Sequence, residues 1–529
     1  MTGERIYLYD TTLRDGAQTQ GVDFSAADKA ALARELDALG IDYVEGGWPG
    51  ANPTDDAFFA KLPTLKQARI AAFGMTRRSG RSAGNDPGLA ATLSSTARVA
   101  TIVGKTWDFH VKVALGAELP ENIEMIADSI AHLKTRLDEV LFDAEHFFDG
   151  YKANPDYALN CLKAAHSAGA RWLVLCDTNG GTLPHEIERI VGAVARIIPG
   201  DRLGIHCHND TENAVANSLA AIRAGARQVQ GTLNGLGERC GNANLISLIP
   251  TLMLKMGYAT GVSEAGLKRL THVSRLLDER LNRAPDRHAA YVGEAAFAHK
   301  GGLHVSAVEK DARSYEHIEP AAVGNRRHVV VSDQAGRSNL LARLREIGID
   351  GEQHQAKLGA LLEQVKEREF AGYAYDGAEA SFELMARRLL DSVPEYFKLQ
   401  SFRVLDERRW NARSELVTLS EATIKVEAGG ERVMTVAEGN GPVNALDTAL
   451  RQALIPHYPE LAQVRLTDYK VRILTPQDGT KAVTRVMIES SDGEDTWSTV
   501  GVSSNVIDAS YIALHDSLTY KLWRAGRRG

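Results

Sequence analysis

Short apolar runs alternate with longer segments of helical periodicity through about the first half of the chain. Eight such runs recur at fairly regular intervals, each followed by a helical segment. Alternating strand and helix units predict a parallel sheet, and eight of them predict closure into a (β/α)8 TIM barrel of the α/β class. An open doubly wound sheet is the competing architecture. The predicted strands are Ile6–Asp10, Tyr43–Gly47, Arg69–Gly74, Val99–Val103, Val140–Ala144, Trp172–Asp177, Leu203–His208 and Gln228–Thr232.

Three segments of this region share one local pattern, in which a helix end is followed by glycine and then by a strand. The glycines are Gly40, Gly169 and Gly225. Because glycine adopts positive φ without steric cost, it can end a helix and turn the chain into the next strand. The repetition supports a fold built from equivalent βα units.

Beyond about residue 270 the pattern changes twice. Residues 271–400 are charged and mostly helical in periodicity, and from about Ser401 strands and helices mix in an α+β module. We therefore expect a catalytic barrel over 1–270, a helical linker over 271–400 and a binding or dimerisation domain over 401–529. The predicted helices are Asn339–Ile347, Gln355–Glu369, Val443–Leu454 and Ala509–Trp523. The predicted C-terminal strands are Ser401–Val404, Ala422–Glu427, Arg432–Glu438 and Asp468–Leu474, with a hairpin turn at Gly429–Gly430.

Composition narrows the classes of function. The chain has 529 residues, too many for one hydrophobic core, so two or three domains are expected. A net charge of −7 without a basic patch excludes nucleic acid as the main partner, and no apolar run reaches the ~18 residues that span a bilayer. The first strand begins close to Met1, which leaves no room for a signal peptide. Four cysteines without CxxC spacing predict reduced thiols and a cytoplasmic location.

The pair His206 and His208 ends the seventh predicted strand. Side chains alternate between the two faces of a strand, so residues two apart point the same way and Cys207 between them faces the other side. Two adjacent imidazoles suit a divalent metal if an oxygen ligand joins them. In a (β/α)8 barrel such a site lies at the C-terminal ends of the strands.

Three further residues are candidates for the oxygen ligand. Asp15 follows the first strand, and one carboxylate with two imidazoles leaves open positions for water and substrate. Asp10 is the alternative carboxylate, but it sits on the strand and suits a supporting role. Asn242, after the eighth strand, offers an amide oxygen directly or through water.

Charged residues near these ligands suggest acid–base chemistry. Arg14 adjoins Asp15, where it can stabilise oxyanion charge or simply form a salt bridge. Glu145 ends the fifth strand and can steer protons or pair with Arg14. Past the barrel, paired glycines at Gly301 and Gly302 lie between His299 and His304, either of which is a candidate base.

Four motifs occur together in a fixed order: Leu13–Gly16, Asp177–Gly180, His206–Asp210 and Gly237–Asn242. This combination resembles the family of 2-isopropylmalate, homocitrate and citramalate synthases, acyltransferases that carry out a Claisen condensation. The segments Glu438–Ala445 and Ser503–Ser510 resemble the C-terminal regulatory module of the same enzymes. The resemblance therefore covers nearly the whole chain.

Within this family, Tyr9–Thr19, Glu45–Pro53 and Phe142–Tyr151 are most similar to citramalate synthases. That resemblance implies condensation of pyruvate with acetyl-CoA, followed by thioester hydrolysis to (R)-citramalate, a threonine-independent entry to isoleucine. The alternatives are 2-oxoisovalerate or 2-oxoglutarate as acceptor, a metal-dependent lyase on the same barrel, and a non-catalytic ligand-binding protein.

The resemblance also implies a role for each site residue. Asp15, His206 and His208 would bind a divalent metal, with Asn242 as a further ligand or support. Mn, Mg, Zn or Co would suit this set of ligands. Arg14 would stabilise the enolate or alkoxide, and His304, assisted by Glu145, would take the methyl proton of acetyl-CoA. Tyr315 and Thr178 would line the site.

The resemblance further implies a homodimer, because the base would act on the barrel of the second copy. It implies feedback inhibition through the C-terminal module, with isoleucine as the expected effector and leucine as the alternative. From its place two residues before Glu145, Asp143 is a candidate polar wall that disfavours branched substrates.

Overall fold

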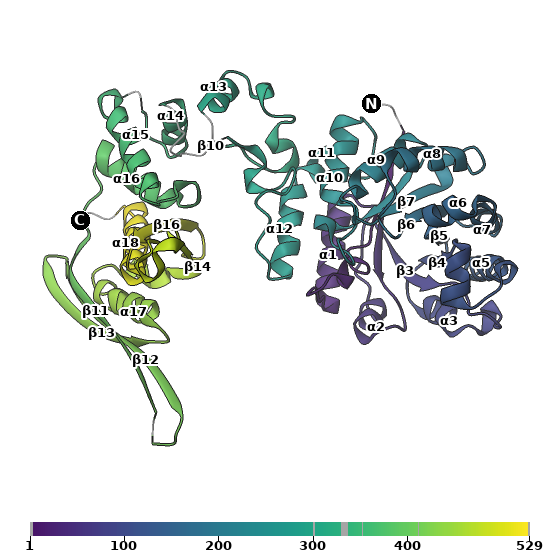
Figure 1. Cartoon of the computed structure of the whole chain (residues 1–529), viewed down its shortest axis with the longest axis horizontal. Helices are drawn as coiled ribbons and strands as arrows, with labels where there is room; N and C mark the ends of the chain where they lie inside the picture. Colours follow the sequence, from purple (N-terminus) through teal and green to yellow (C-terminus); the bar gives the residue numbers. More distant parts are fainter. Residues whose placement is uncertain (1–3, 300–301, 330–336, 352, 411, 527–529) are drawn as a thin grey trace. The chain divides into compact units, whose positions relative to one another are not determined.

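The computed structural model describes residues 4–299, 302–329, 337–351, 353–410 and 412–526. It divides into two compact units (Figure 1). The first comprises Met1–Phe297 with His317–Arg327, and the second comprises Ala298–Glu316 with His328–Gly529. The three-domain division at residues 270 and 400 stays a prediction. No helix among the described residues is both long enough and apolar enough to cross a membrane.

Eight parallel strands close into a barrel in the order of the sequence, which confirms the predicted fold. Pairing of β1 with β8 excludes the open sheet. Each strand lies within two residues of its predicted bounds. The strands are β1 Tyr7–Asp10, β2 Tyr43–Gly47, β3 Arg69–Met75, β4 Val99–Lys105, β5 Glu139–Glu145, β6 Trp172–Asp177, β7 Leu203–Cys207 and β8 Gln228–Gly231.

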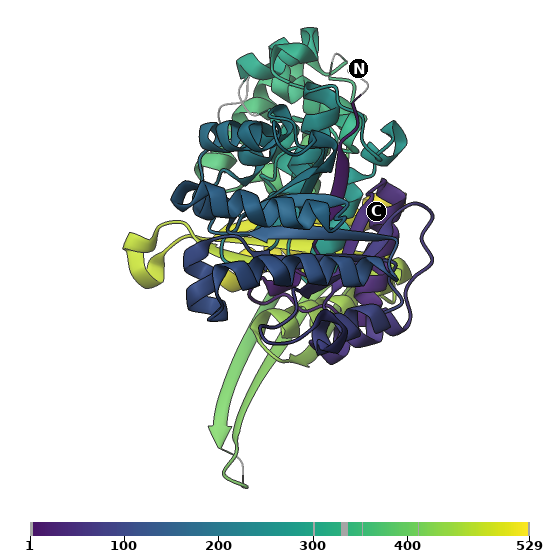
Figure 2. The same cartoon turned by 90° about the vertical axis from the view of Figure 1, so that its right-hand side faces the viewer.

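Helices surround the barrel and bury the outer faces of the strands in one large apolar cluster (Figures 1 and 2). The three patterned glycines all have positive φ, and a Cβ on Gly40 would lie 2.5 Å from the Gly261 carbonyl oxygen. The helices of this unit are α1 Ala26–Leu39, α2 Pro53–Ala60, α3 Pro87–Ser94, α4 Asp108–His110, α5 Leu119–Lys134, α6 Phe147–Ala153, α7 Pro155–Ser167, α8 Pro184–Val194, α9 Ala214–Arg223, α10 Leu245–Pro250, α11 Glu264–Leu267 and α12 Leu270–Arg280.

The barrel interior holds a second, partly aromatic cluster. Tyr9, Tyr43 and Trp172 are buried there, and the two tyrosine rings stack with centroids 5.8 Å apart. Both faces of these strands are therefore buried, which explains why the strands read as continuous apolar runs.

The second unit begins with helices. A short parallel pair, β9 Ala298–His299 with β10 His328–Val329, accompanies α13 Gly302–Lys310. Next come α14 Arg337–Glu346, α15 Gln355–Phe370 and α16 Glu379–Leu390, which share an apolar cluster. The two helices predicted here, Asn339–Ile347 and Gln355–Glu369, correspond to α14 and α15.

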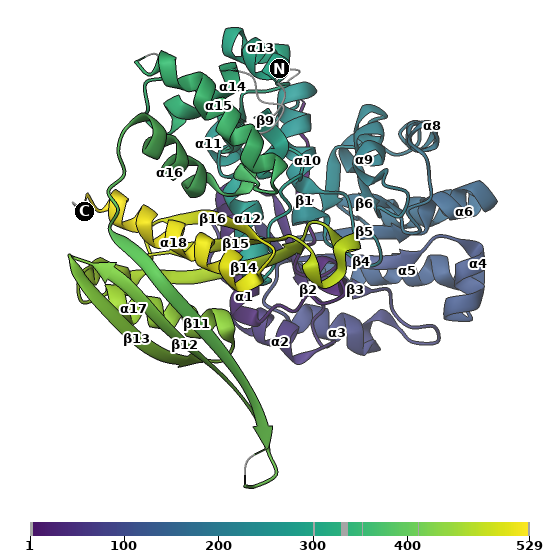
Figure 3. The ribbon, with the colours of Figure 1, turned by 60° about the vertical axis from the view of Figure 1, so that its left-hand side comes forward.

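Two three-stranded antiparallel sheets form the rest of this unit, the first packed against α17 (Pro442–Leu454) and the second against α18 (Val506–Arg524) and α16 (Figure 3). The hairpin at Gly429–Gly430 is confirmed, with positive φ at both glycines. The first sheet comprises β11 Phe397–Trp410, β12 Leu416–Ala428 and β13 Glu431–Gly439. The second comprises β14 Arg465–Ile473, β15 Thr484–Ser491 and β16 Thr496–Ser503.

The hydrophobic pattern underestimated these sheets in two places. It missed β15 and β16, because polar residues such as Ser490 and Thr499 occupy positions that face the helix. It also shortened β11 and β12, whose outer halves form an exposed, charged ribbon that projects past α17 (Figures 2 and 3). Cross-strand pairing, rather than burial of an apolar face, defines that ribbon, so the hydrophobic pattern does not reveal it.

Candidate active site and metal centre

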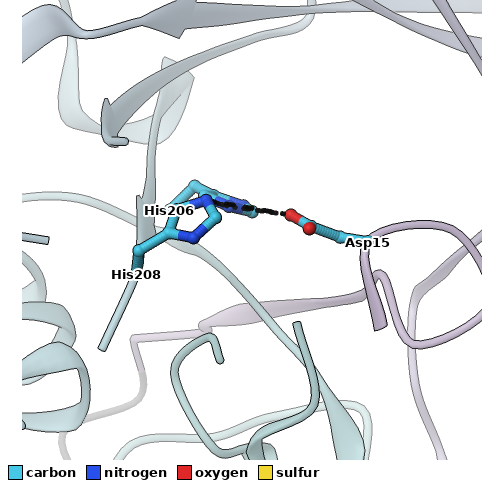
Figure 4. Close-up of side chains that lie close together, drawn as sticks. All are labelled: Asp15, His206 and His208. Atoms are coloured by element: carbon cyan, nitrogen blue, oxygen red, sulfur yellow. Dashed lines mark hydrogen bonds and ion pairs between the residues drawn. The ribbon is translucent and has the colours of Figure 1, made fainter. Parts of the chain in front are cut away.

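Asp15, His206 and His208 come together at the C-terminal mouth of the barrel (Figure 4). His206 lies on β7, His208 follows that strand, and Asp15 lies in the turn after β1. The Oδ2 atom of Asp15 is 3.4 Å from His206 Nε2 and 3.9 Å from His208 Nε2, and the two Nε2 atoms are 3.3 Å apart. All three side chains are buried. Cys207 faces the outer apolar cluster, as expected from strand alternation.

The donor set of this cluster fits a divalent metal. Burial and the charge of His206 lower the pKa of His208 to about 3, so its ring is neutral at pH 7. Burial acts to raise the pKa of Asp15, but Arg14 and His206 overcome it and hold the pKa well below its usual range. The result is a charged carboxylate beside a ring nitrogen with a free lone pair. Such a set of ligands suits Zn, Mn, Co or Mg.

Asn242 supports the same interpretation. Its Nδ2 donates a hydrogen bond to Asp15 Oδ2 at 2.9 Å, which orients the carboxylate. Its Oδ1 is buried and has no hydrogen-bond partner among the described residues. Because buried polar atoms are usually paired, this oxygen is suited to a metal ion or to a water on it. The alternative carboxylate, Asp10, instead accepts hydrogen bonds from the backbone N–H and the hydroxyl of Thr12.

His206 is held in place by a residue that lies outside the predicted site. Its Nδ1 lies 2.9 Å from Gln230 Oε1, and Gln230 Nε2 donates to Asp143 Oδ1 at 3.1 Å. Because Nδ1–H donates to Gln230, Nε2 is the ring nitrogen that can lose its proton and give a lone pair to a metal ion. Burial, then the charge of Glu45, raises the pKa of Asp143 to about 7. The sequence signal for this supporting role is the presence of two glutamines, Gln228 and Gln230, at alternate positions of the buried strand β8.

Arg14 is fixed beside the cluster by a buried carboxylate. Its Nε donates to Glu45 Oε2 at 2.6 Å, and its Nη1 lies 3.7 Å from Asp15 Oδ2. Glu45 also accepts hydrogen bonds from the hydroxyls of Tyr9 at 2.7 Å and Thr11 at 2.5 Å. The guanidinium therefore makes a salt bridge and still lies next to the metal ligands. The sequence motif that contains Glu45 does not by itself predict this role.

Glu145 and Thr178 lie at the ends of β5 and β6. The ion-pair partner of Glu145 is Lys105, so the expected alternative pairing with Arg14 is wrong. Thr178 Oγ1 accepts a hydrogen bond from the His146 backbone N–H at 2.9 Å, and its carbonyl oxygen accepts one from Arg239 Nη2 at 2.6 Å. Thr178 thus links the loops that follow β5 and β8.

His304 and Tyr315 belong to the second unit, where their rings stack with centroids 4.1 Å apart. His304 is exposed on α13. His299 is buried, and its Nε2 lies 3.1 Å from Glu316 Oε1. Of the paired glycines between these histidines, Gly301 lies outside the described residues. Within the second unit, His304 is therefore the more accessible of the two candidate bases.

Comparison with known proteins covers almost the whole chain. Residues 5–277 match the HMGL-like family, residues 291–370 the homocitrate synthase post-HMGL domain-like family, and residues 377–522 the LeuA allosteric (dimerisation) domain. The (R)-citramalate synthase of Aquifex aeolicus strain VF5 is 51% identical over 528 residues, 99% of each chain. That of Geobacter sulfurreducens is 52% identical over 98% of each chain. A 2-isopropylmalate synthase of Rhodopseudomonas palustris strain HaA2 is 30% identical over 92% of this chain and 89% of its own.

Replacing Asp15 with Asn removes the charged member of the metal cluster while keeping its size. We expect metal affinity to fall by more than the roughly 10–100-fold typical of losing an outer-shell partner. Mass-spectrometric metal analysis of stripped and reloaded protein measures this. Asp10→Asn is the matched control. It should retain its metal, because the Asp10 carboxylate accepts hydrogen bonds from Thr12 and is not part of the cluster. Full metal content in the Asp15 variant would contradict the assignment.

Replacing Glu45 with Gln leaves the Arg14 guanidinium, whose side chain is 14% exposed, without its main counter-charge. We expect a loss of about 3 kcal/mol in the free energy of unfolding, as for other broken buried ion pairs. Urea titration followed by circular dichroism measures the loss. Asp138→Asn breaks the exposed Arg98–Asp138 pair and should cost less than about 1 kcal/mol. Equal losses in the two variants would show that burial of the Glu45 pair is unimportant.

Proposed function

The chain belongs to the (R)-citramalate synthase family, and from that premise we propose that it condenses pyruvate with acetyl-CoA. The observation that carries this proposal is identity of about half over the full length, which includes the barrel, the linker and the regulatory domain. The acetyl-CoA methyl loses a proton, its carbon attacks the keto carbon of pyruvate, and the new alkoxide is protonated. Water then cleaves the thioester, which releases (R)-citramalate and CoA.

Asp15, His206 and His208 would hold a divalent metal, and Asn242 Oδ1 is free to take part. When bound, the metal supplies a Lewis acid that polarises the keto group of the acceptor. Gln230 keeps the His206 ring in the orientation that binding needs, and Asn242 does the same for Asp15. Mn, Mg, Zn and Co all remain compatible with this donor set.

Arg14 would stabilise the negative oxygen that develops on the acceptor or the enolate. Its hydrogen bond to Glu45 fixes the guanidinium before substrate arrives, which is the condition for electrostatic stabilisation without reorganisation. Its place 3.7 Å from Asp15 sets it beside any substrate held at the cluster. Thr178 would line the same mouth of the barrel.

We propose His304 as the base that takes the methyl proton, with Tyr315 stacked on its ring to orient it. Exposure of His304 and the buried ion pair of His299 support this choice. Glu145, paired with Lys105, would assist proton transfer at the barrel mouth. The active form would be a homodimer, which the match to a LeuA allosteric (dimerisation) domain supports. Four free cysteines support a cytoplasmic location.

The rival functions differ in the acceptor or in the direction of the reaction. Identity of 51% to a citramalate synthase against 30% to a 2-isopropylmalate synthase favours pyruvate over 2-oxoisovalerate. The regulatory domain argues against a lyase, which has no need of an end-product sensor. The intact Arg14, Asp15, His206 and His208 argue against a non-catalytic binding protein.

Release of the CoA thiol with different acceptors tests this function. We expect strong turnover of metal-loaded enzyme with pyruvate and little with 2-oxobutyrate, 2-oxoisovalerate or 2-oxoglutarate. Glu145→Gln should lower kcat by roughly 10²–10⁴-fold, as for other proton-transfer groups, without loss of the metal ion at Asp15. Turnover mainly with a larger oxo acid would move the enzyme to a related function. No thiol release with any acceptor would leave the lyase reaction as the alternative.

Isoleucine should inhibit the enzyme, because the product leads toward that amino acid and the C-terminal domain matches an allosteric one. We expect isoleucine to lower the rate of thiol release and to raise the melting temperature, since a ligand at 100 times its Kd adds about 2.7 kcal/mol of stability. Leucine is the control, with a smaller effect at the same concentration. Stronger inhibition by leucine would reassign the effector.

A further inference from the structure

A second group of potential metal ligands lies at the C-terminal ends of β4 and β5. It consists of His110, Glu145 and His146, whose ligand atoms all lie within 4.8 Å of one another. His110 ends α4, Glu145 is the last residue of β5, and His146 precedes α6. We propose that these three side chains bind a second transition-metal ion, distinct from the one at Asp15, His206 and His208.

Unpaired buried nitrogens support this site. The Nδ1 atoms of His110 and of His146 are both buried and have no hydrogen-bond partner among the described residues. His146 Nδ1 and Asp149 Oδ2 lie 3.6 Å apart. This distance is short enough for an ion pair but too long for a hydrogen bond. Buried imidazole nitrogens are normally hydrogen-bonded, so two Nδ1 atoms without a hydrogen bond in one cluster are suited to a metal ion.

The backbone is arranged to bring the two rings together. His146 has a φ of 55°, in the left-handed region that side chains other than glycine rarely adopt. The hydrogen bond from its N–H to Thr178 Oγ1 holds this conformation, and its ring meets that of His110 edge to face at 4.5 Å. His110 leads directly into a π-helical turn at Val111–Leu115, a rare element that is frequent at functional sites.

Two imidazoles with one carboxylate are the same donor set as at Asp15, and they suit transition-metal ions such as Zn²⁺, Co²⁺ or Ni²⁺. Lys105 already forms an ion pair with Glu145, so an incoming metal must displace that ammonium. The site is therefore weaker than the one at Asp15. One consequence rests on the proposed function. Excess zinc should inhibit the condensation, because a zinc ion bound to the Glu145 carboxylate keeps it from taking part in proton transfer.

Titration of untagged, metal-stripped protein with Co²⁺, followed by its visible absorption and by metal analysis, tests the second site. We expect two ions per chain, the second at least tenfold weaker. His110→Asn should abolish only the weaker ion and relieve inhibition by excess zinc, whereas Asp15→Asn should abolish only the tighter one. His185→Asn, at an exposed histidine, is the matched control and should keep both.

His146→Asn is a second variant in case His110→Asn does not fold, because asparagine tolerates the left-handed conformation. One ion per chain in the wild type, or two in both histidine variants, would overturn the proposal. A raised KM for acetyl-CoA in His110→Asn with an unchanged metal count would also overturn it and assign the cluster to the acyl-CoA pocket. Metal counts do not depend on turnover, so failure of the proposed function stays distinguishable.

Discussion

The pairing of β1 with β8 is the constraint on which the active site depends. Four residue pairs, from Tyr7 with Gln228 to Asp10 with Gly231, join the first strand to the last. Two further links tie the loops that follow: Thr12 Oγ1 accepts a hydrogen bond from the Leu233 N–H, and Thr19 exchanges hydrogen bonds with Gly237. Closure therefore brings Asp15 within 2.9 Å of Asn242, 227 residues further along the chain, and beside the two histidines at the end of β7.

Closure also concentrates charge in a small buried volume, and the mouth of the barrel is stable because its charges are paired. Glu45 accepts hydrogen bonds from Tyr9, Thr11 and Arg14, while Gln230 separates Asp143 from His206. Burial raises the pKa of Asp143 to about 7, whereas Arg14 and His206 hold that of Asp15 well below its usual range. Two carboxylates in one barrel are thus prepared for different roles by their neighbours.

Burial of apolar side chains against helices also organises the two C-terminal sheets. The first sheet buries one face against α17. The second buries one face against α18, while Met487, Val500 and Val502 on its other side pack with α14–α16. Val436 and Met434 on β13, together with Leu405 on β11, are exposed apolar residues on the side away from α17. A dimerisation domain needs such a face, whereas the barrel, covered by helices all round, does not.

Several features of this protein could be determined from the sequence alone. The barrel strands are buried on both faces and so appear as apolar runs. The candidate metal ligands His206 and His208 lie two residues apart at the end of β7, and glycine marks three of the helix-to-strand turns. These signals are local. Gln230, Glu45 and the His110–His146 contact became visible only in the tertiary structure, because each depends on neighbours from other strands. That Asp15 rather than Asp10 lies beside the two histidines, and that Glu145 pairs with Lys105, also became visible only there. A side chain's partner is set by barrel closure and strand register, which no single segment encodes.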